Sequence, residues 1–164
     1  MHIDSTSISR WYPPRSPYGL LQEDLWPNEW KILIACLLLN LTTRKQVDGV
    51  IYELFRRWPS PAHLETAPVT ELEELLKPLG MWRKRSRTLL RFNREYLEGG
   101  WKTARDLHGC GKYADDCWHI FCVGDWRLVQ PQDHALNKYH DYLLSLDNNT
   151  RRKNVEVSTF AAAL

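Results

Sequence analysis

The chain has 164 residues, 43% of them hydrophobic, and a formal net charge of only +2. This length fits one domain with a single buried core, and the small charge excludes a strong overall field for polyanions, so any nucleic-acid binding would depend on local patches. The longest apolar run, at 32–39, has eight residues. A membrane span is excluded because about 20 apolar residues are needed to cross a bilayer.

Residues 1–17 are predicted to form an irregular N-terminal arm. They contain three prolines and several serines and have no periodic pattern. Trp11 and Tyr12 are the side chains expected to dock this arm on the domain. The arm lacks the apolar core of a secretory signal, so the four cysteines are expected to be reduced thiols.

The first long helix is predicted after Asn28, which can cap the segment EWKILIACLLLN. This segment is apolar nearly all round, as expected for a central helix that is buried on most sides. Thr43 and Gln46 have the spacing of a capping box. The apolar residues between Val47 and Trp58 then follow a helical period, which predicts a second helix with one buried face.

Two short helices are predicted next. Ser60 and Pro61 provide an N-cap and a first-turn proline, and Thr70 with Glu73 repeats the capping-box spacing. The segment LKPLG cannot continue a helix, so a new helix is predicted near Met81.

The helix after Met81 carries the strongest basic stripe of the chain. Arg83, Arg87, Arg91 and Arg94 recur at helical spacing. A solvated face and a phosphate-facing surface are equally compatible with this stripe. The residues expected to point inward are Trp82, Leu89, Leu90, Tyr96 and Leu97. Because alternation with a period of two is nowhere sustained, the chain is predicted to be all-α, with about eight short helices.

The segment LHGCGKY, at 107–113, is predicted to be a tight turn between two helices. Gly109 and Gly111 permit positive φ and close approach of the backbone, and Tyr113 begins the next helix. The free backbone N–H groups that open this helix could bind an anion, with Lys112 adding charge. An ordinary interhelical turn is the alternative.

The cysteine spacing does not favour a metal site. Cys110, Cys117 and Cys122 are separated by six and four residues, whereas structural zinc needs close pairs and iron–sulfur clusters normally need four thiolates. Cys36 lies in the apolar central helix, where a free cysteine behaves as a small hydrophobic residue. No metal is expected at these thiols.

About twenty residues after the glycine turn comes VQPQDHALNKYHD, and the combination resembles the helix–hairpin–helix DNA glycosylases. PPRSPYGLLQEDL, LLKPLG, LHGCGKYADD, FCVGDW and DHALNKYHDY more narrowly resemble the glycosylase domain of the methyl-CpG-binding-domain thymine glycosylases, from about Trp11 to Leu146. The resemblance implies an all-α fold of two helical lobes with the active-site cleft between them. It also implies a glycosylase domain at 18–146. The segment 147–164 has no counterpart in the resemblance and is expected to be a mobile basic tail, with DNA contacts by Arg151, Arg152 and Lys153 as the alternative.

The resemblance assigns Asp133 as the catalytic aspartate. A carboxylate beside the deoxyribose can stabilise oxocarbenium charge or orient water, although Asp133 could also simply cap the following helix, and the two roles are compatible. Tyr113 stands where bifunctional relatives have a nucleophilic lysine, so an intact abasic site is the implied product. Gln22 and Tyr113 are implied to surround the flipped base.

The resemblance also implies a set of DNA contacts. Leu41, where vertebrate relatives have an arginine, would wedge into the gap left by the flipped nucleotide, and Met81 would be a second wedge or else a core residue that starts a helix. Ala135 replaces a lysine of the vertebrate pattern. The remaining implied contacts are Arg83, Lys84, His108, Gly109, Gly111 and Lys112.

The function implied is a nuclear, monomeric base-excision repair enzyme. It would hydrolyse the glycosidic bond of thymine, uracil or a modified pyrimidine opposite guanine in double-stranded DNA. No cofactor is implied apart from a monovalent cation at the hairpin carbonyls, and no iron–sulfur cluster, because no cysteine follows Asp133. The alternatives are a DNA-binding module without activity and a bifunctional lyase.

Overall fold

The computed structural model describes residues 10–163, which fold into eight α-helices without a β-strand. The all-α prediction is therefore confirmed. The helices are α1 (Leu21–Leu25), α2 (Glu29–Leu39), α3 (Arg44–Arg57), α4 (Pro61–Glu65), α5 (Val69–Leu76), α6 (Trp82–Glu98), α7 (Lys112–Trp118) and α8 (His134–Ala162). None of the described helices is both long and apolar enough to span a membrane.

Helix α2 is the centre of the fold. Its residues Ile32, Leu33 and Ile34 are fully buried, and the helix packs against α1, α3, α6 and α7. The side chain of Asn28 accepts a hydrogen bond from the backbone N–H of Lys31, so the predicted cap is confirmed. The predicted central helix therefore organises the packing of both halves of the molecule.

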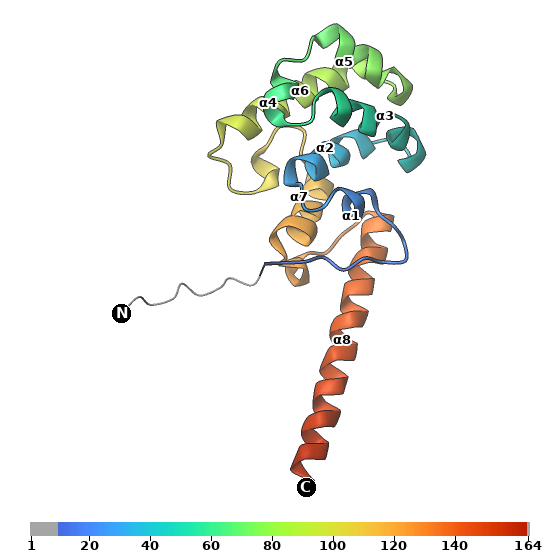
Figure 1. The fold of residues 1–164 in the computed structure, drawn as a ribbon, viewed down its shortest axis with the longest axis vertical. Helices are drawn as coiled ribbons and strands as arrows, with labels where there is room; N and C mark the ends of the chain where they lie inside the picture. The colour runs from blue at the N-terminus through green and yellow to red at the C-terminus, as the bar shows by residue number, and fades with distance from the viewer. Residues whose placement is uncertain (1–9, 164) are drawn as a thin grey trace, which may run out of the picture.

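The helices form two lobes on either side of α2. Figure 1 shows α3, α4, α5 and α6 grouped at one end, and α1, α7 and the start of α8 at the other. The glycine turn before α7 brings the chain back from the first lobe to the second. This arrangement confirms the predicted two-lobed fold and leaves hollows where the lobes meet.

Two of the three predicted caps after α2 are confirmed. Thr43 and Gln46 form the reciprocal capping box of α3, and the Ser60 side chain caps α4. The Thr70 prediction is wrong, because α5 already begins at Val69 and the carbonyl of Pro68 accepts the N–H of Leu72. Proline fixes its own φ, so the chain enters the helix directly after Pro68.

The buried face of α6 is more polar than expected. Leu89 and Phe92 are buried as apolar residues, but Arg85, Ser86 and Asn93 are buried beside them. Leu97 was expected to point inward and is instead 47% exposed. It lies in the last turn, just before Gly99 ends the helix, where a side chain has fewer neighbours.

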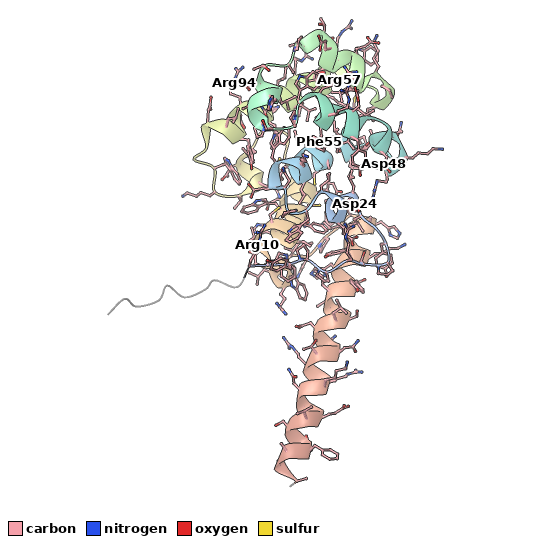
Figure 2. All side chains as sticks on the ribbon, in the orientation of Figure 1. Arg10, Asp24, Asp48, Phe55, Arg57 and Arg94 are labelled. Atoms are coloured by element: carbon pink, nitrogen blue, oxygen red, sulfur yellow. The ribbon has the colours of Figure 1, made fainter. Side chains whose placement is uncertain are left out.

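The basic stripe of α6 is exposed, but part of it is paired within the protein. Arg91 bonds to Glu95, and Arg94 bonds to Glu65 of α4 at 3.1 Å. Figure 2 shows Arg94 at the outer surface of its lobe. These two arginines therefore match the solvated-face interpretation, whereas Arg83 and Arg87 are exposed beside Met81.

The C-terminal segment, expected to be a mobile tail from residue 147, continues α8 without interruption to Ala162. The segment contains neither glycine nor proline to stop the helix. The first half of α8 packs on the domain through its buried residues Leu136, Tyr139 and Leu143. The second half projects away from both lobes (Figures 1 and 2). The proposed domain boundary therefore falls inside a continuous helix.

The described part of the N-terminal arm, 10–17, is irregular and docked. Trp11 donates its indole N–H to the carbonyl of Ile120 at 2.8 Å, and the ring of Tyr12 lies 5.4 Å from that of Trp26. Trp11 therefore docks as predicted, whereas Tyr12 remains 63% exposed although its ring lies beside that of Trp26. Residues 1–9 of the predicted arm lie outside the described residues.

Candidate active site

A cavity of about 560 Å³ opens where four distant segments meet. The loop before α1, the turn between α2 and α3, the start of α7 and the start of α8 each contribute part of its wall. Its lining includes Tyr18, Gln22, Leu41, Arg44, Tyr113, Asp133, Ala135 and Lys138. The structure thus brings Asp133, Tyr113 and Gln22 together, as the sequence resemblance implied.

Asp133 is both the cap of α8 and part of the cavity wall. Its Oδ2 accepts the backbone N–H of Leu136 at 2.9 Å, so the carboxylate is held at the positive end of a long helix. Its Oδ1 accepts no hydrogen bond from any described residue. One carboxylate oxygen is thereby fixed, and the other remains available to a bound molecule.

Gln22 and Tyr113 form a hydrogen-bonded pair on the cavity floor. Gln22 is only 1% exposed, and its Nε2 donates to Tyr113 Oη at 2.8 Å. Burial, reinforced by the neighbouring thiols, raises the pKa of Tyr113 far above its ordinary value, so the phenol stays neutral. Because Oη accepts from Gln22, the neutral hydroxyl keeps its own proton as a hydrogen-bond donor.

The thiols of Cys36 and Cys117 pack beside this pair. Gln22 Nε2 also approaches the sulfur of Cys117 at 3.5 Å and that of Cys36 at 3.7 Å. Burial raises the pKa of Cys117 well above its ordinary value and that of Cys110 to about 12. Within the described residues, no group of three or more histidine, cysteine or acidic side chains could hold a metal ion.

The loop over the cavity is fixed by two charged residues that the sequence analysis missed. Glu23, which is buried, accepts hydrogen bonds from the backbone N–H groups of Ser16 and Leu20. Arg44 donates to the carbonyl of Gly19 at 2.8 Å. The position of Glu23 next to Gln22 was the available signal, because a charged residue beside a predicted site residue can support it.

A second hollow, of about 310 Å³, lies between the turn after α2, the start of α6 and the glycine turn. Five predicted DNA-contact residues line it: Leu41, Met81, Lys84, His108 and Gly109. Leu41 (φ 59°) and Met81 (φ 46°) are the two non-glycine residues with positive φ within 10–163. Leu41 is 82% exposed and Met81 49%, so Met81 is not a core residue.

Only one glycine of the hairpin needs its conformational freedom. Gly109 has φ 82°, and a Cβ there would lie 2.7 Å from Thr88 Cγ2 and 2.9 Å from Leu37 Cδ2. Gly111 was expected to need the same freedom, but its φ is −91° and a Cβ would meet nothing within 4 Å. The tight approach therefore occurs at Gly109 alone, because only this residue packs against α2 and α6.

Three predicted DNA-contact residues, Gly111, Lys112 and Arg83, lie outside this hollow. Lys112 turns its ammonium group to Asp116 Oδ2 at 2.5 Å and to the carbonyl of Gln130 at 2.8 Å. Arg83 lies on the adjoining surface with Trp82 and Arg87. The structure therefore gathers Leu41 and Met81, the two predicted wedges, with Gly109, but it engages Lys112 within the protein.

The sequence is similar to several curated proteins, although no protein-family model matches it. It is 44% identical over 143 residues to a methyl-CpG-binding domain protein 4-like protein of Arabidopsis thaliana, covering 87% of this chain and 32% of that protein. It is 40% identical to a thymine/uracil-DNA glycosylase of Pyrobaculum aerophilum, covering 52% and 40%, respectively. A thymine-DNA glycosylase of Aeropyrum pernix is 39% identical, covering 51% and 37%.

Two solved structures share the fold. A thermostable thymine-DNA glycosylase has a TM-score of 0.54 at 24% identity, covering 59% of this chain and 48% of that one. An endonuclease III–DNA complex has a TM-score of 0.52 at 24% identity, covering 57% and 48%, respectively. The fold is therefore that of the helix–hairpin–helix DNA glycosylases.

This chain belongs to the helix–hairpin–helix DNA glycosylase superfamily, on its fold and on its similarity to the methyl-CpG-binding domain protein 4-like protein and the archaeal thymine glycosylases. It spans between 32% and 40% of the length of these curated relatives.

Proposed function

We propose that this chain is a monofunctional DNA glycosylase that hydrolyses the glycosidic bond of thymine or uracil, or of a modified pyrimidine, mispaired with guanine. The observation that carries the proposal is the arrangement of Asp133 with Gln22 and Tyr113 around one cavity. The names of two relatives, a thymine/uracil-DNA glycosylase and a thymine-DNA glycosylase, support the substrate class.

The chemistry follows from what each cavity group can donate or accept. A pyrimidine nucleotide turned out of the duplex would present its polar edge to the Gln22 amide and the Tyr113 hydroxyl. The C1′–N1 bond then breaks, and its electron pair leaves with the base. Asp133 Oδ1 faces the positive charge that develops on the sugar and orients a water, whose oxygen bonds to C1′ while its proton passes to the carboxylate.

The cavity lining includes one lysine, Lys138, whose ammonium group lies 5.8 Å from the centroid of the Tyr18 ring. Tyr113, a neutral phenol, stands at the position of the lysine in bifunctional relatives and cannot form a Schiff base. The neighbouring Lys112 is bonded to Asp116, away from the cavity lining. The proposed product is therefore an intact abasic site.

The proposed partner is double-stranded DNA bound by a monomer in the nucleus. Leu41 and Met81 enter the base stack of the duplex as wedges. Arg83, Lys84, His108 and the turn from Gly109 to Gly111 face the DNA backbone. Lys112 contributes to this face only if its ammonium group leaves Asp116. The nuclear location rests on the family resemblance alone. A monovalent cation fits the hairpin chemically, because the carbonyls of His108 and Gly109 accept no backbone hydrogen bond among the described residues and oxygen ligands suit such ions.

The direct test is single-turnover base release from duplexes that contain one G·T or G·U pair. Asp133→Asn keeps a capping oxygen and should lower the release rate by about 100-fold or more. Asp141→Asn, on the exposed side of the same helix, is the matched control and should release base at the wild-type rate. Equal rates for wild type and Asp133→Asn would contradict the proposal.

Two further readouts separate the alternatives. Tight duplex binding by the wild type without any base release would identify a DNA-binding module instead of an enzyme, which the replacements at Leu41 and Ala135 make worth testing. A covalent protein–DNA adduct trapped with borohydride would identify a lyase and contradict the assignment of Tyr113.

A further inference from the structure

Arg85 is a buried arginine that links two distant turns. Arg85 is only 8% exposed and lies on the inner face of α6. Nε donates to the carbonyl of Gly80 at 2.9 Å, and Nη2 donates to the carbonyl of Asn40 at 3.0 Å. Asn40 and Gly80 come directly before Leu41 and Met81, the two non-glycine residues with left-handed backbone among those described.

These two hydrogen bonds act on the backbone geometry of the wedge turns. A carbonyl shares its peptide plane with the N–H of the following residue, so fixing the carbonyl of Asn40 restrains φ of Leu41. The same holds for Gly80 and Met81. Left-handed backbone is unfavourable for residues with a side chain, and such conformations persist only where surrounding contacts determine them.

Ion pairing does not explain the position of Arg85. No described carboxylate lies within ion-pair distance of its guanidinium, and a buried charge is costly unless its N–H groups are satisfied. Burial also lowers the pKa of the group from its ordinary value. The planar guanidinium reaches two carbonyls in fixed directions, which the single ammonium group of lysine cannot do.

We infer that Arg85 is a positioning residue that fixes the spacing and direction of the Leu41 and Met81 side chains, so that they enter the duplex as one unit. The inference rests on the proposed function, because wedging matters only if a nucleotide is extruded. Arg85 lines the hollow between the wedges and the hairpin, so it lies behind the tips it supports.

The test combines Arg85→Ala with removal of both wedges in a double-mutant cycle. Base release from a G·U duplex under single-turnover conditions should slow by about 100-fold in Arg85→Ala, because small misplacements of positioning groups have effects of this size. In the Leu41→Gly/Met81→Gly background, Arg85→Ala should change the rate by less than about threefold, since no wedge remains to position. Arg85→Lys should be intermediate.

Asn93→Ala is the matched control for a merely structural effect. Asn93 is buried on the same helix and donates to the carbonyl of Pro61, far from both wedge turns in the sequence. Its loss should affect release equally in the two backgrounds. If Arg85→Ala also slows release equally in both, the positioning role is overturned. If Arg85→Ala does not fold at the assay temperature, Arg85→Lys carries the same cycle.

A binding readout keeps this inference separate from the proposed function. A 2-aminopurine placed next to the mismatch brightens when a wedge unstacks it. With saturating wild-type protein this signal should rise, and with saturating Arg85→Ala it should rise less, whatever happens to base release. A signal unchanged by Arg85→Ala, or no signal from the wild type, overturns the positioning role, whereas absent base release overturns only the enzyme assignment.

Discussion

The glycine hairpin and the two wedge turns use the same left-handed backbone but use it in opposite ways. At Gly109 the absence of a side chain lets the chain pass against Thr88 and Leu37. At Leu41 and Met81 the left-handed residue keeps a large side chain, and that side chain projects into solvent. Left-handed backbone thus lets the hairpin pack closely against the core, whereas at the wedge turns it places large apolar side chains in solvent.

This difference shows where backbone strain is concentrated in the molecule. A non-glycine residue in the left-handed region costs about 1–2 kcal/mol, which glycine avoids. The costlier choice occurs in the described residues only at the two tips held by Arg85. Strain at an exposed apolar side chain suggests that the side chain is needed for binding rather than for folding.

The largest expected effect is at the hairpin. Gly109→Ala should lower the free energy of unfolding by about 3 kcal/mol, because left-handed strain adds to a collision with two packed side chains. Urea denaturation measures this change. Gly111→Ala is the matched control, with a change of about 0.5 kcal/mol or less expected at a position with room for Cβ. Equal effects at both positions would show that Gly109 is no more constrained than Gly111.

At the wedge turns the prediction has the opposite sign for stability. Leu41→Gly and Met81→Gly relieve left-handed strain but add freedom to the unfolded chain, so stability should rise by about 0.5 kcal/mol. Base release from a G·T duplex should nevertheless slow, by about tenfold for each substitution, because unstacking loses an apolar wedge worth roughly 1–2 kcal/mol. Thermal unfolding and single-turnover release measure the two effects. Lower stability together with unchanged release would contradict the assignment of these side chains as wedges.

The smallest expected effect concerns Cys110, the inward-facing residue of the hairpin. Burial raises the pKa of its thiol from 9.0 to about 12, so the folded state holds the proton more tightly than the unfolded state. This contribution is complete below pH 9 and is lost as the pH rises toward 12. Between pH 8 and pH 10 stability should fall by about 1 kcal/mol through this group.

The control for the pH effect is Cys110→Ala. The alkaline loss of stability, measured by urea denaturation at pH 8 and pH 10, should be smaller in this variant by about the same 1 kcal/mol. Stability should still fall somewhat with rising pH in this variant, because other buried groups, among them Cys117, also have a raised pKa. An identical slope in wild type and variant would show that the hairpin side chain is not buried in solution.

The sequence predicted the features that depend on neighbouring residues. The caps at Asn28, Thr43 and Ser60 were readable because cap and helix lie within four residues. The cap at Thr70 failed because Pro68, only two residues earlier, offered an earlier helix start. Family resemblance supplied Asp133 and its distant partners, which no local pattern could have joined.

What the sequence determined by itself was the helical class, the starts of most of the long helices and the residue types available at the site. The tertiary structure alone decided that Arg85 belongs to the core and not to the basic stripe, that Gly109 is constrained while Gly111 is not, and that α8 continues beyond the lobes. The physical reason is the separation in sequence between the residues that interact. Periodicity and caps act within a few residues, whereas the contact between Arg85 and Asn40 joins positions 45 residues apart that become neighbours only when α2 and α6 pack.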